Sequence, residues 1–318
     1  MIGALRAAEI DLEACFNGEG HAPEPLTADE LSAGRTPLEP GVAMDLPDWL
    51  VPLFINSLGG EVQARNVANQ LKTRAPVMLR VNIRKTALEA ALRLLADEGI
   101  NVETVPIATT ALRVITGARQ VAQSAAYREG FVELQDGSSQ AAMEMLDVRP
   151  TGCVLDYCAG GGGKVLALAA RLEGQWVAHD ALQQRMKDLP ARARRAGVSV
   201  RVQDANHLEK QMFDLVLCDV PCSGSGTWRR TPDAKWRLTA ADLTDLNRTQ
   251  DAILDRAAGL VAPDGLLAYA TCSVLAPENE ERIGAFLARH PDWQVVSQRH
   301  WPVSDMGDGF FLAQLKIK

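Results

Sequence analysis

The stretch LDYCAGGGGKV, residues 155–165, joins an apolar run that predicts a buried strand to a run that predicts a helix over 163–172. Its four consecutive glycines let the backbone turn sharply and approach a ligand closely, and the N-terminus of the helix offers free N–H groups. Neither register of G-x-G-x-x-G ends on a glycine here, and no phosphate-binding G-K-[ST] follows. The stretch therefore favours a nucleoside-bearing cofactor other than NAD or ATP, with a purely structural turn as the alternative.

From about residue 150 onward, apolar runs of strand length alternate with helical patterns. This alternation predicts an α/β domain with a doubly wound, Rossmann-like sheet, whose ligands bind beyond the carboxyl ends of the strands. The last two runs have no helical pattern between them, so we expect a C-terminal antiparallel hairpin at one sheet edge. Pro190 falls inside the helical run 181–196 and should kink or shorten that helix. The expected strands are CVLDY (153–157), QWVAH (175–179), VSVRVQ (198–203), FDLVLCDV (213–220), LLAYATC (266–272), WQVVS (293–297) and FFLAQLKI (310–317).

A smaller module is expected upstream of this domain. Helical spacing begins at Leu46 and continues through 61–75, and a strand–helix–strand–strand pattern follows over 77–115. Such an α+β (RRM-like) module often presents a sheet face to RNA, although a plain interaction or spacer domain has the same pattern. We therefore divide the chain into an N-terminal extension (1–45), a helical and α+β RNA-binding domain (46–140) and a cofactor-binding domain (141–318).

Composition limits the class of protein. The chain has 318 residues, 47% of them apolar, and a net charge of −7, which argues only weakly against a nucleic-acid partner because phosphate contact needs just a local basic face. It has neither a secretory signal pattern nor an apolar run that would span a bilayer, so we expect a cytoplasmic protein that binds no membrane. The six cysteines lack paired C-x-x-C spacing, which predicts free thiols and no metal site.

Three acidic residues follow successive expected strands: Asp180, Asp204 and Asp219. One carboxylate at a strand end is commonly a helix cap, but three along one sheet edge converge on a single crevice. Asp180 lies twenty-four residues beyond Asp156, a spacing at which a carboxylate often binds ribose hydroxyls. We expect these acids to line the cofactor site.

Two cysteines also follow apolar strand runs, Cys222 in DVPCSGSG and Cys272 in YATCSV. Free cysteines are commonly buried small hydrophobes, and Cys153 and Cys218 inside expected strands fit that interpretation. The two thiols at strand ends are instead candidates for a shared site at the sheet edge, where a thiolate acts as a nucleophile.

The segment TWRRTPDAKWR (227–237) holds four cationic residues against one aspartate, with two tryptophans among them. Basic residues interleaved with aromatics are suited to phosphate contact and base stacking, so Arg229, Arg230 and Arg237 are candidate RNA contacts. A solvated loop with core tryptophans is the alternative.

Taken together, these motifs resemble those of the Sun/RsmB (Fmu) family of RNA cytosine-C5 methyltransferases, which use S-adenosylmethionine. The resemblance runs from about Leu46 to the C-terminus. It implies a class I methyltransferase sheet and an RNA substrate, with rRNA preferred over tRNA, and we expect a monomer. The family usually has Ala-Pro-Gly-Gly where this chain has four glycines. The stretches that carry the resemblance are RVN (80–82), ELQDGSSQ (133–140), DYCAGGGGK (156–164), DANH (204–207), DVPCSGSGTWRRTPDAKWR (219–237), YATCSVLAPENEE (269–281) and DGFFLAQLK (308–316).

The resemblance also implies roles for individual residues. Cys272 would attack carbon 6 of cytosine, Cys222 would assist release of the methylated product, and Asp219 would bind the base edge. A methyltransferase acting on DNA or protein, which would not need Cys272, and a catalytically idle RNA-binding or assembly factor are the alternatives. The implied cofactor-binding residues are Cys158, Ala159, Gly160, Gly161, Gly162, Gly163, Lys164, Asp180, Asp204 and Asp219.

Overall fold

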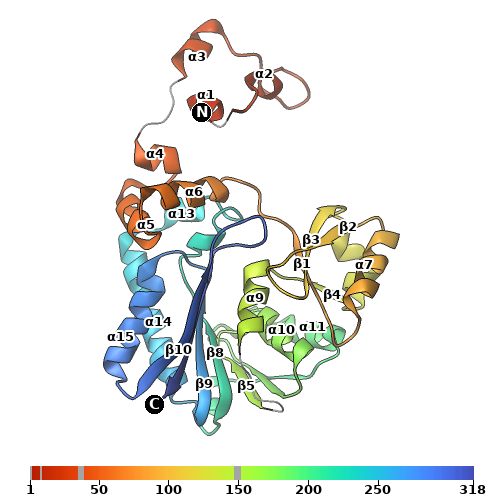
Figure 1. The fold of residues 1–318 in the computed structure, drawn as a ribbon, viewed down its shortest axis with the longest axis vertical. Coiled ribbons are helices and arrows are strands. Elements are labelled where there is room, and N and C mark those ends of the chain that lie inside the picture. Colours follow the sequence, from red (N-terminus) through yellow and green to blue (C-terminus); the bar gives the residue numbers. More distant parts are fainter. Residues whose placement is uncertain (1, 8, 35–38, 147–151) are drawn as a thin grey trace. The chain divides into compact units, whose positions relative to one another are not determined.

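The computed structural model describes residues 2–7, 9–34, 39–146 and 152–318 (Figure 1). The chain folds into two compact units, 1–69 and 70–318. Within the described ranges, no helix combines the length and the apolarity that crossing a membrane requires.

The first unit is helical, and the helices expected beyond Leu46 are present. Leu50 and Phe54 are fully buried in it. Its helix α3 begins with a capping box, in which Thr27 accepts the N–H of Glu30 and the Glu30 carboxylate accepts the N–H of Thr27. The helices are α1 (Ile2–Ala7), α2 (Leu12–Cys15), α3 (Ala28–Ala33), α4 (Pro40–Met44), the 3-10 turn η1 (Asp48–Leu50), α5 (Val51–Ser57) and α6 (Glu61–Leu71), the last of which runs into the second unit.

The second unit begins with a four-stranded antiparallel sheet of order β2-β3-β1-β4, which confirms the expected α+β module. Residues Leu79 and Val81 of its central strand alternate toward a core shared with Leu95 of a covering helix. The short fourth strand was not predicted from the sequence. The elements are β1 (Met78–Val81), α7 (Leu88–Asp97), β2 (Asn101–Thr104), β3 (Ala111–Thr116), η2 (Val121–Gln123), α8 (Ala125–Arg128) and β4 (Val132–Leu134).

The opposite face of this small sheet packs against helices that follow it in the chain. Met78 lies in the same core as Met143 of α9 (Gly137–Met145), and Arg80 donates from Nη1 to the carbonyl of Leu166 in α10 (Gly163–Arg171), at 3.3 Å. Both β1 side chains are buried. Around β1, this face is therefore covered by α9 and α10, because strand alternation turns Met78 and Arg80 toward them. The predicted RNA-binding role of the module stays a prediction.

The large sheet has seven strands in the order β10-β11-β9-β8-β5-β6-β7. Strands β7, β6, β5, β8 and β9 run parallel, and β11 pairs antiparallel with both neighbours, which confirms the doubly wound sheet with a C-terminal hairpin. The strands are β5 (Cys153–Asp156), β6 (Gln175–Ala178), β7 (Val200–Val202), β8 (Phe213–Asp219), β9 (Val261–Thr271), β10 (Trp293–Trp301) and β11 (Phe310–Ile317).

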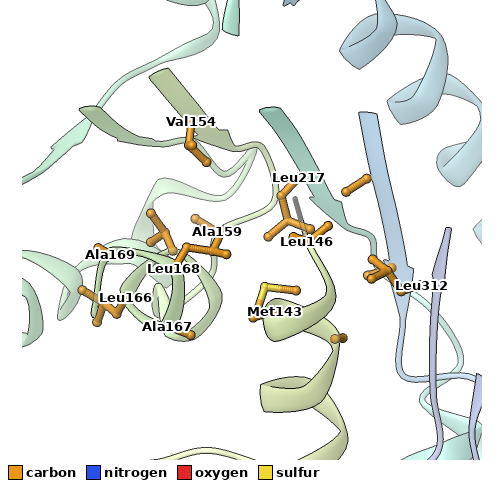
Figure 2. Close-up of a cluster of buried hydrophobic side chains, with 14 of the residues drawn as sticks. Met143, Leu146, Val154, Ala159, Leu166, Ala167, Leu168, Ala169, Leu217 and Leu312 are labelled. Atoms are coloured by element: carbon orange, nitrogen blue, oxygen red, sulfur yellow. The ribbon is translucent and has the colours of Figure 1, made fainter. Parts of the chain in front are cut away.

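Helices cover both faces of this sheet (Figure 1). On one face, Met143 of α9 and Leu168 of α10 pack with Leu217 of β8 (Figure 2). On the other face, Leu254 and Phe286 pack against the sheet. The remaining helical elements are η3 (Gln183–Met186), α11 (Leu189–Ala196), α12 (Ala205–Leu208), η4 (Ser225–Thr227), α13 (Ala234–Arg237), α14 (Ala240–Ala258), η5 (Ala276–Glu278) and α15 (Glu280–Arg289).

Pro190 shortens its helix as expected. The structure divides the run 181–196 into η3 and α11, and Pro190 stands in the first turn of α11. A proline is tolerated there because the first N–H groups of a helix have no intrahelical acceptor.

Two loops of the second unit cross at glycines. The N–H of Gly226 donates to the carbonyl of Cys272, and the N–H of Gly309 donates to the carbonyl of Gly226, both at 3.0 Å. A Cβ on Gly226 would lie 2.3 Å from the carbonyl oxygen of Gly309. The loop that follows β8 therefore needs glycine at this position to reach the loop after β9 and the start of β11.

We predict that Gly226→Ala lowers the free energy of unfolding by about 1–3 kcal/mol, because its Cβ meets backbone that cannot rotate away. Gly284→Ala is the matched control: its Cβ has no heavy atom within 4 Å, and it lies in α15. That substitution should raise stability by roughly 0.5–1 kcal/mol. Urea unfolding measures both, and a Gly226→Ala variant as stable as the wild type would contradict the crossing.

Candidate active site

The site lies where the strand order of the large sheet reverses. From β5 the chain proceeds to β6 and β7 on one side, and then returns to β8 and β9 on the other. The carboxyl ends of β5 and β8 are hydrogen-bonded neighbours, with Asp156 beside Leu217. Loops that leave such a point in opposite directions open a crevice between them. The glycine-rich loop follows β5, and Asp219 is the last residue of β8.

The conformation of the glycine loop requires its glycines. Gly162 is the N-cap of α10 with φ of +81°, in the left-handed region that side chains disfavour. A Cβ at Gly162 would lie 2.2 Å from Cδ1 of Leu189. The loop is thus folded tightly between β5 and α11. Its glycines are needed for this conformation as well as for the approach of a ligand.

An arginine from α11 braces this loop. Arg192 donates from Nη1 to the carbonyl of Gly161, and a Cβ on Gly161 would come within 2.7 Å of the same nitrogen. Nε of Arg192 lies 3.5 Å from Oε2 of Glu133 in β4, which also accepts a 2.7 Å hydrogen bond from Arg195. A chain of polar contacts therefore connects the glycine loop with the small sheet.

Two cavities adjoin the loop and share Cys158 and Arg185. The larger, of about 850 Å³, is lined by Asp180 and Asp204 together with the apolar Leu182. Its size is that of a small-molecule site. The smaller, of about 240 Å³, is lined by Gln135, Ser139, Cys158, Ala159, Gly160, Gly161, Gly163, Lys164, Arg185, Arg192 and Asp219. The structure thus brings nine of the ten expected cofactor residues to the cavity walls, all except Gly162.

The carboxylates of the larger cavity already hold backbone. Asp180 is 3% exposed and accepts the N–H groups of Gly160 and Leu182, both at 2.9 Å. Asp204 caps α12 and accepts a 2.7 Å hydrogen bond from Nδ1 of His207. The hydrogen bonds from His207 hold the pKa of Asp204 below its ordinary value. Each acid therefore has a structural role in addition to its place on the cavity wall.

Asp156 is a residue of this site that sequence reasoning used only as a reference point for spacing. Its carboxyl is 1% exposed; Oδ2 accepts the N–H of Val165, while Oδ1 is buried without a partner. Burial, with the nearby charge of Asp219, raises the pKa of Asp156 to about 7, although Lys164 opposes the shift. An unpartnered carboxylate oxygen beside the glycine loop is suited to an ammonium donor.

Lys164 and Asp219 form an ion pair across the crevice, from Nζ to Oδ2. Burial lowers the pKa of Lys164, but the charge of Asp219 more than compensates and leaves that pKa raised. Nζ of Lys164 also lies 5.3 Å from the ring centroid of Phe310 in β11. The pair links the helix after β5 with the end of β8.

The two candidate thiols meet at this same edge. Sγ of Cys222 and Sγ of Cys272 are 3.4 Å apart, and both residues are partly exposed. The hydrogen bond with Cys272, followed by burial, raises the pKa of Cys222 well above its ordinary value. Cys218, in contrast, is fully buried inside β8.

A buried acid that the sequence analysis did not select, Glu278, lies behind the thiols. It is 0% exposed, in the turn η5 after the second cysteine loop. Oε1 accepts the N–H of Ser223 at 2.8 Å, and Oε2 accepts the hydroxyl of Ser273 at 2.6 Å. Each of these serines directly follows one of the two cysteines. The only sequence signal was its position inside the quoted stretch YATCSVLAPENEE.

The basic segment is placed differently from the expectation. Arg229 is 7% exposed and donates from Nε to Asp308 at 2.6 Å, so its placement does not support a phosphate contact. Arg230 is partly exposed and donates to the same carboxylate. Arg237 is exposed, as is Trp236 beside it. Residues Arg230, Trp236 and Arg237 therefore remain the accessible part of the predicted RNA contact.

Comparison with known proteins identifies the family. The model described as 16S rRNA methyltransferase RsmB/F matches residues 143–316, more than half of the chain, and that of the RsmF/B-like ferredoxin-like domain matches residues 46–121. The chain belongs to the RsmB/F methyltransferase family. The small antiparallel sheet is thus the family's ferredoxin-like domain, and the family confirms the resemblance found in the sequence.

Individual relatives agree. Ribosomal RNA small subunit methyltransferase B of Salmonella arizonae is 34% identical over 284 residues, which cover 85% of this chain and 66% of that protein. The chain thus spans about two thirds of its relative's length. A crystal structure of PH0851 is 29% identical and covers 91% of this chain and 71% of the other, with a TM-score of 0.79. NSun6 from Pyrococcus horikoshii, solved with SFG, is 17% identical and shares the fold with a TM-score of 0.75. The match covers 85% of this chain and 98% of the other.

The cofactor of this family is S-adenosylmethionine, as the sequence predicted. The residues of the RsmB/F site fit it. Asp156 offers an unpartnered carboxylate oxygen to the amino group of S-adenosylmethionine. The smaller cavity beside the glycine loop has space for its methionine portion, and the larger cavity beside Asp180 and Leu182 has room for its nucleoside.

We predict that Arg192→Ala weakens binding of S-adenosylmethionine about tenfold, because the glycine loop loses the hydrogen bond that orders it in place of the family's proline. Arg194→Ala, exposed on the same helix, is the control and should bind as the wild type does. Calorimetric titration measures both. Equal affinities in the two variants would show that the brace does not order the loop.

A second prediction concerns pH. Because the pKa of Asp156 is raised from 3.8 to about 7, the folded protein keeps a proton that the unfolded chain loses between these values. Stability of the cofactor-free protein should therefore fall as pH rises from about 4 to 7. Asp156→Asn keeps an oxygen that accepts the N–H of Val165 but cannot titrate, so its stability should not decline over this range. At pH 8 its free energy of unfolding should exceed that of the wild type by a few kcal/mol.

Urea unfolding at several pH values gives the comparison. Asp245→Asn is the control, because that carboxylate is exposed on α14 and should leave the wild-type profile unchanged. Parallel profiles for wild type and Asp156→Asn would contradict the raised pKa.

Proposed function

We propose that this chain transfers a methyl group from S-adenosylmethionine to carbon 5 of a cytosine in ribosomal RNA, through a covalent adduct with Cys272. The observation that carries the proposal is the 3.4 Å separation of the Cys222 and Cys272 sulfurs at the sheet edge that also bears the glycine loop. A methyltransferase acting on protein or DNA would have no use for both thiols in one place.

The chemistry requires a nucleophile because carbon 5 of cytosine is itself unreactive. Attack of the Cys272 thiolate on carbon 6 forms an S–C bond and moves the ring's electron pair to carbon 5, which can then accept a methyl group. When bound, S-adenosylmethionine supplies that group as an electrophile. Transfer of the proton on carbon 5 to a base, the role proposed for the Cys222 thiolate, returns the electron pair to the ring, breaks the S–C bond and frees Cys272.

The neighbouring residues have complementary roles in this proposal. Oδ2 of Asp219 accepts a hydrogen bond from Nζ of Lys164. Its other oxygen can then accept a hydrogen bond from the base edge, the role that the resemblance implies for this residue. A thiolate at Cys272 would lie within electrostatic reach of Lys164, since the charge of Cys272 is among the causes that raise the pKa of that lysine. Cys222, whose sulfur lies 3.4 Å from that of Cys272, would assist release by taking the proton from carbon 5 once its thiol is ionised, and its raised pKa makes that thiolate the stronger base.

The proposed substrate rests on the family. The matching family model and the Salmonella arizonae relative are both named for small-subunit ribosomal RNA. Exposed Trp236 offers a stacking surface next to the cationic Arg237, which fits a single-stranded segment of RNA. The binding of SFG, an analogue of S-adenosylmethionine, to the similarly folded NSun6 supports the choice of cofactor.

The test separates the two thiols. Cys272→Ala should abolish both methyl transfer and any covalent protein–RNA complex, because the thiolate begins the reaction. Cys222→Ala should still attack and methylate, then accumulate a methylated covalent complex that survives denaturing electrophoresis. Cys15→Ala, in the first unit, is the control and should retain full activity.

Other outcomes have definite meanings. A stalled complex in Cys272→Ala instead of Cys222→Ala would exchange the two roles. Full activity of both variants would refute the thiol mechanism. RNA binding without methyl transfer by the wild type would favour an idle RNA-binding factor, and methylation of DNA or protein in place of RNA would replace the substrate.

A further inference from the structure

The carboxylate of Glu278 is held by four donors from three segments. Besides the N–H of Ser223 and the hydroxyl of Ser273, it accepts the hydroxyl of Ser223 on Oε2 and Nε2 of Gln250 on Oε1, the latter at 3.1 Å. Gln250 is fully buried on α14 and also donates to the carbonyl of Pro221 at 2.9 Å. Every donor therefore belongs to a cysteine-bearing loop or to the helix beneath it.

Such an arrangement is costly unless it is complete. A fully buried carboxylate loses its hydration, and hydrogen bonds to the charged form must replace it. With two donors on each oxygen, the Glu278 carboxylate is stable only while both serines stay in place. Because Glu278 bonds a serine of each loop, neither loop can move without breaking hydrogen bonds to this carboxylate.

Further bonds extend the connection. The hydroxyls of Ser225 and Ser273 are 2.8 Å apart, and Ser225 accepts the N–H of Val274 at 2.9 Å. Asn279, the residue after Glu278, donates to the carbonyl of Ser273 at 3.0 Å. The polar cluster lies entirely beneath the thiols, and Ser225, Ser273, Glu278 and Asn279 are each at most 1% exposed.

We propose that Glu278 is a positioning residue that fixes the two cysteine loops relative to each other, so that both thiols reach one cytosine in succession. The proposal rests on the proposed function for its purpose, but the clamp itself concerns only the protein. Glu278 does not touch the substrate: it acts through Ser223 and Ser273, the residues that follow the two thiols.

Electrostatics gives the clamp a second consequence. After the hydrogen bond with Cys272 and burial, the negative charge of Glu278 adds to the causes that raise the pKa of Cys222. The charge of Glu278 therefore acts on the thiol that the proposed release step uses as its base. Removing the charge should therefore change thiol chemistry even where the loops keep their shape.

The experiment compares Glu278→Gln, which keeps the shape and removes the charge, with Glu281→Gln, an exposed neighbour on the first turn of α15. In the first measurement, alkylation by iodoacetamide is followed for each cysteine by mass spectrometry over a range of pH. We expect Cys222 in Glu278→Gln to react about tenfold faster at neutral pH, because one of the charges that raise its pKa is gone and its loop is less restrained. Glu281→Gln should match the wild type.

The second measurement is single-turnover methyl transfer to ribosomal RNA. Glu278→Gln should lower the rate on the order of 10²-fold, with the KM values for RNA and S-adenosylmethionine changed by no more than about twofold, because misplaced reacting groups affect the chemical step. Glu278→Asp keeps the charge on a shorter side chain, and should restore the slow alkylation of Cys222 but not the full rate.

A folded Glu278→Gln with wild-type alkylation and rate would overturn the proposal. If that variant does not fold, the double variant Ser223→Ala and Ser273→Ala replaces it: it removes two hydroxyl donors but keeps the charge, should lower the methyl-transfer rate as Glu278→Gln does, and would overturn the proposal by keeping the wild-type rate. The alkylation measurement needs no substrate. A shift in alkylation with a wild type that methylates nothing would support the clamp and refute the proposed function, so the two failures are distinguishable.

Discussion

The ion pair between Lys164 and Asp219 joins the two halves of the site, and the rest of the arrangement depends on it. Lys164 belongs to the first turn of the helix after β5, whereas Asp219 ends β8, on the other side of the point where the strand order reverses. Both residues line the smaller cavity. The two charges act in opposite directions on the buried acid nearby: burial and the charge of Asp219 raise the pKa of Asp156 to about 7, while Lys164 opposes the shift.

A second set of constraints acts around the thiols. Cys222 and Cys272 lie fifty residues apart in the chain and 3.4 Å apart at their sulfurs, which neither loop could ensure alone. Gly226 allows the loops to cross, Glu278 holds the serine after each cysteine, and Asp308 anchors Arg229 at the far side of the first loop. The site is therefore rigid on its protein side, as groups that must act in sequence on one base require.

The glycine loop shows how a departure from the family pattern is accommodated. Where the family usually has a proline, Gly161 lies against Arg192, whose guanidinium bonds the loop's carbonyl and is itself held by Glu133. The restraint that a proline ring would place within the loop here comes from α11 and from the ferredoxin-like sheet. The same sheet buries Arg80 and Glu133 on the side that meets these helices.

The sequence by itself determined the doubly wound sheet, its terminal hairpin and the loops that carry Asp219, Cys222 and Cys272, because strand alternation and glycine spacing are local signals. The family and its cofactor came from the resemblance of whole motifs to those of a known family. Only the tertiary structure decided which polar groups are used internally. Burial of Arg229 against Asp308, the covered face of β1 and the unpartnered oxygen of Asp156 all result from contacts between segments distant in sequence. Glu278 was overlooked for the same reason: one acid in a polar run has no periodicity, and its role appears only where two loops meet around it.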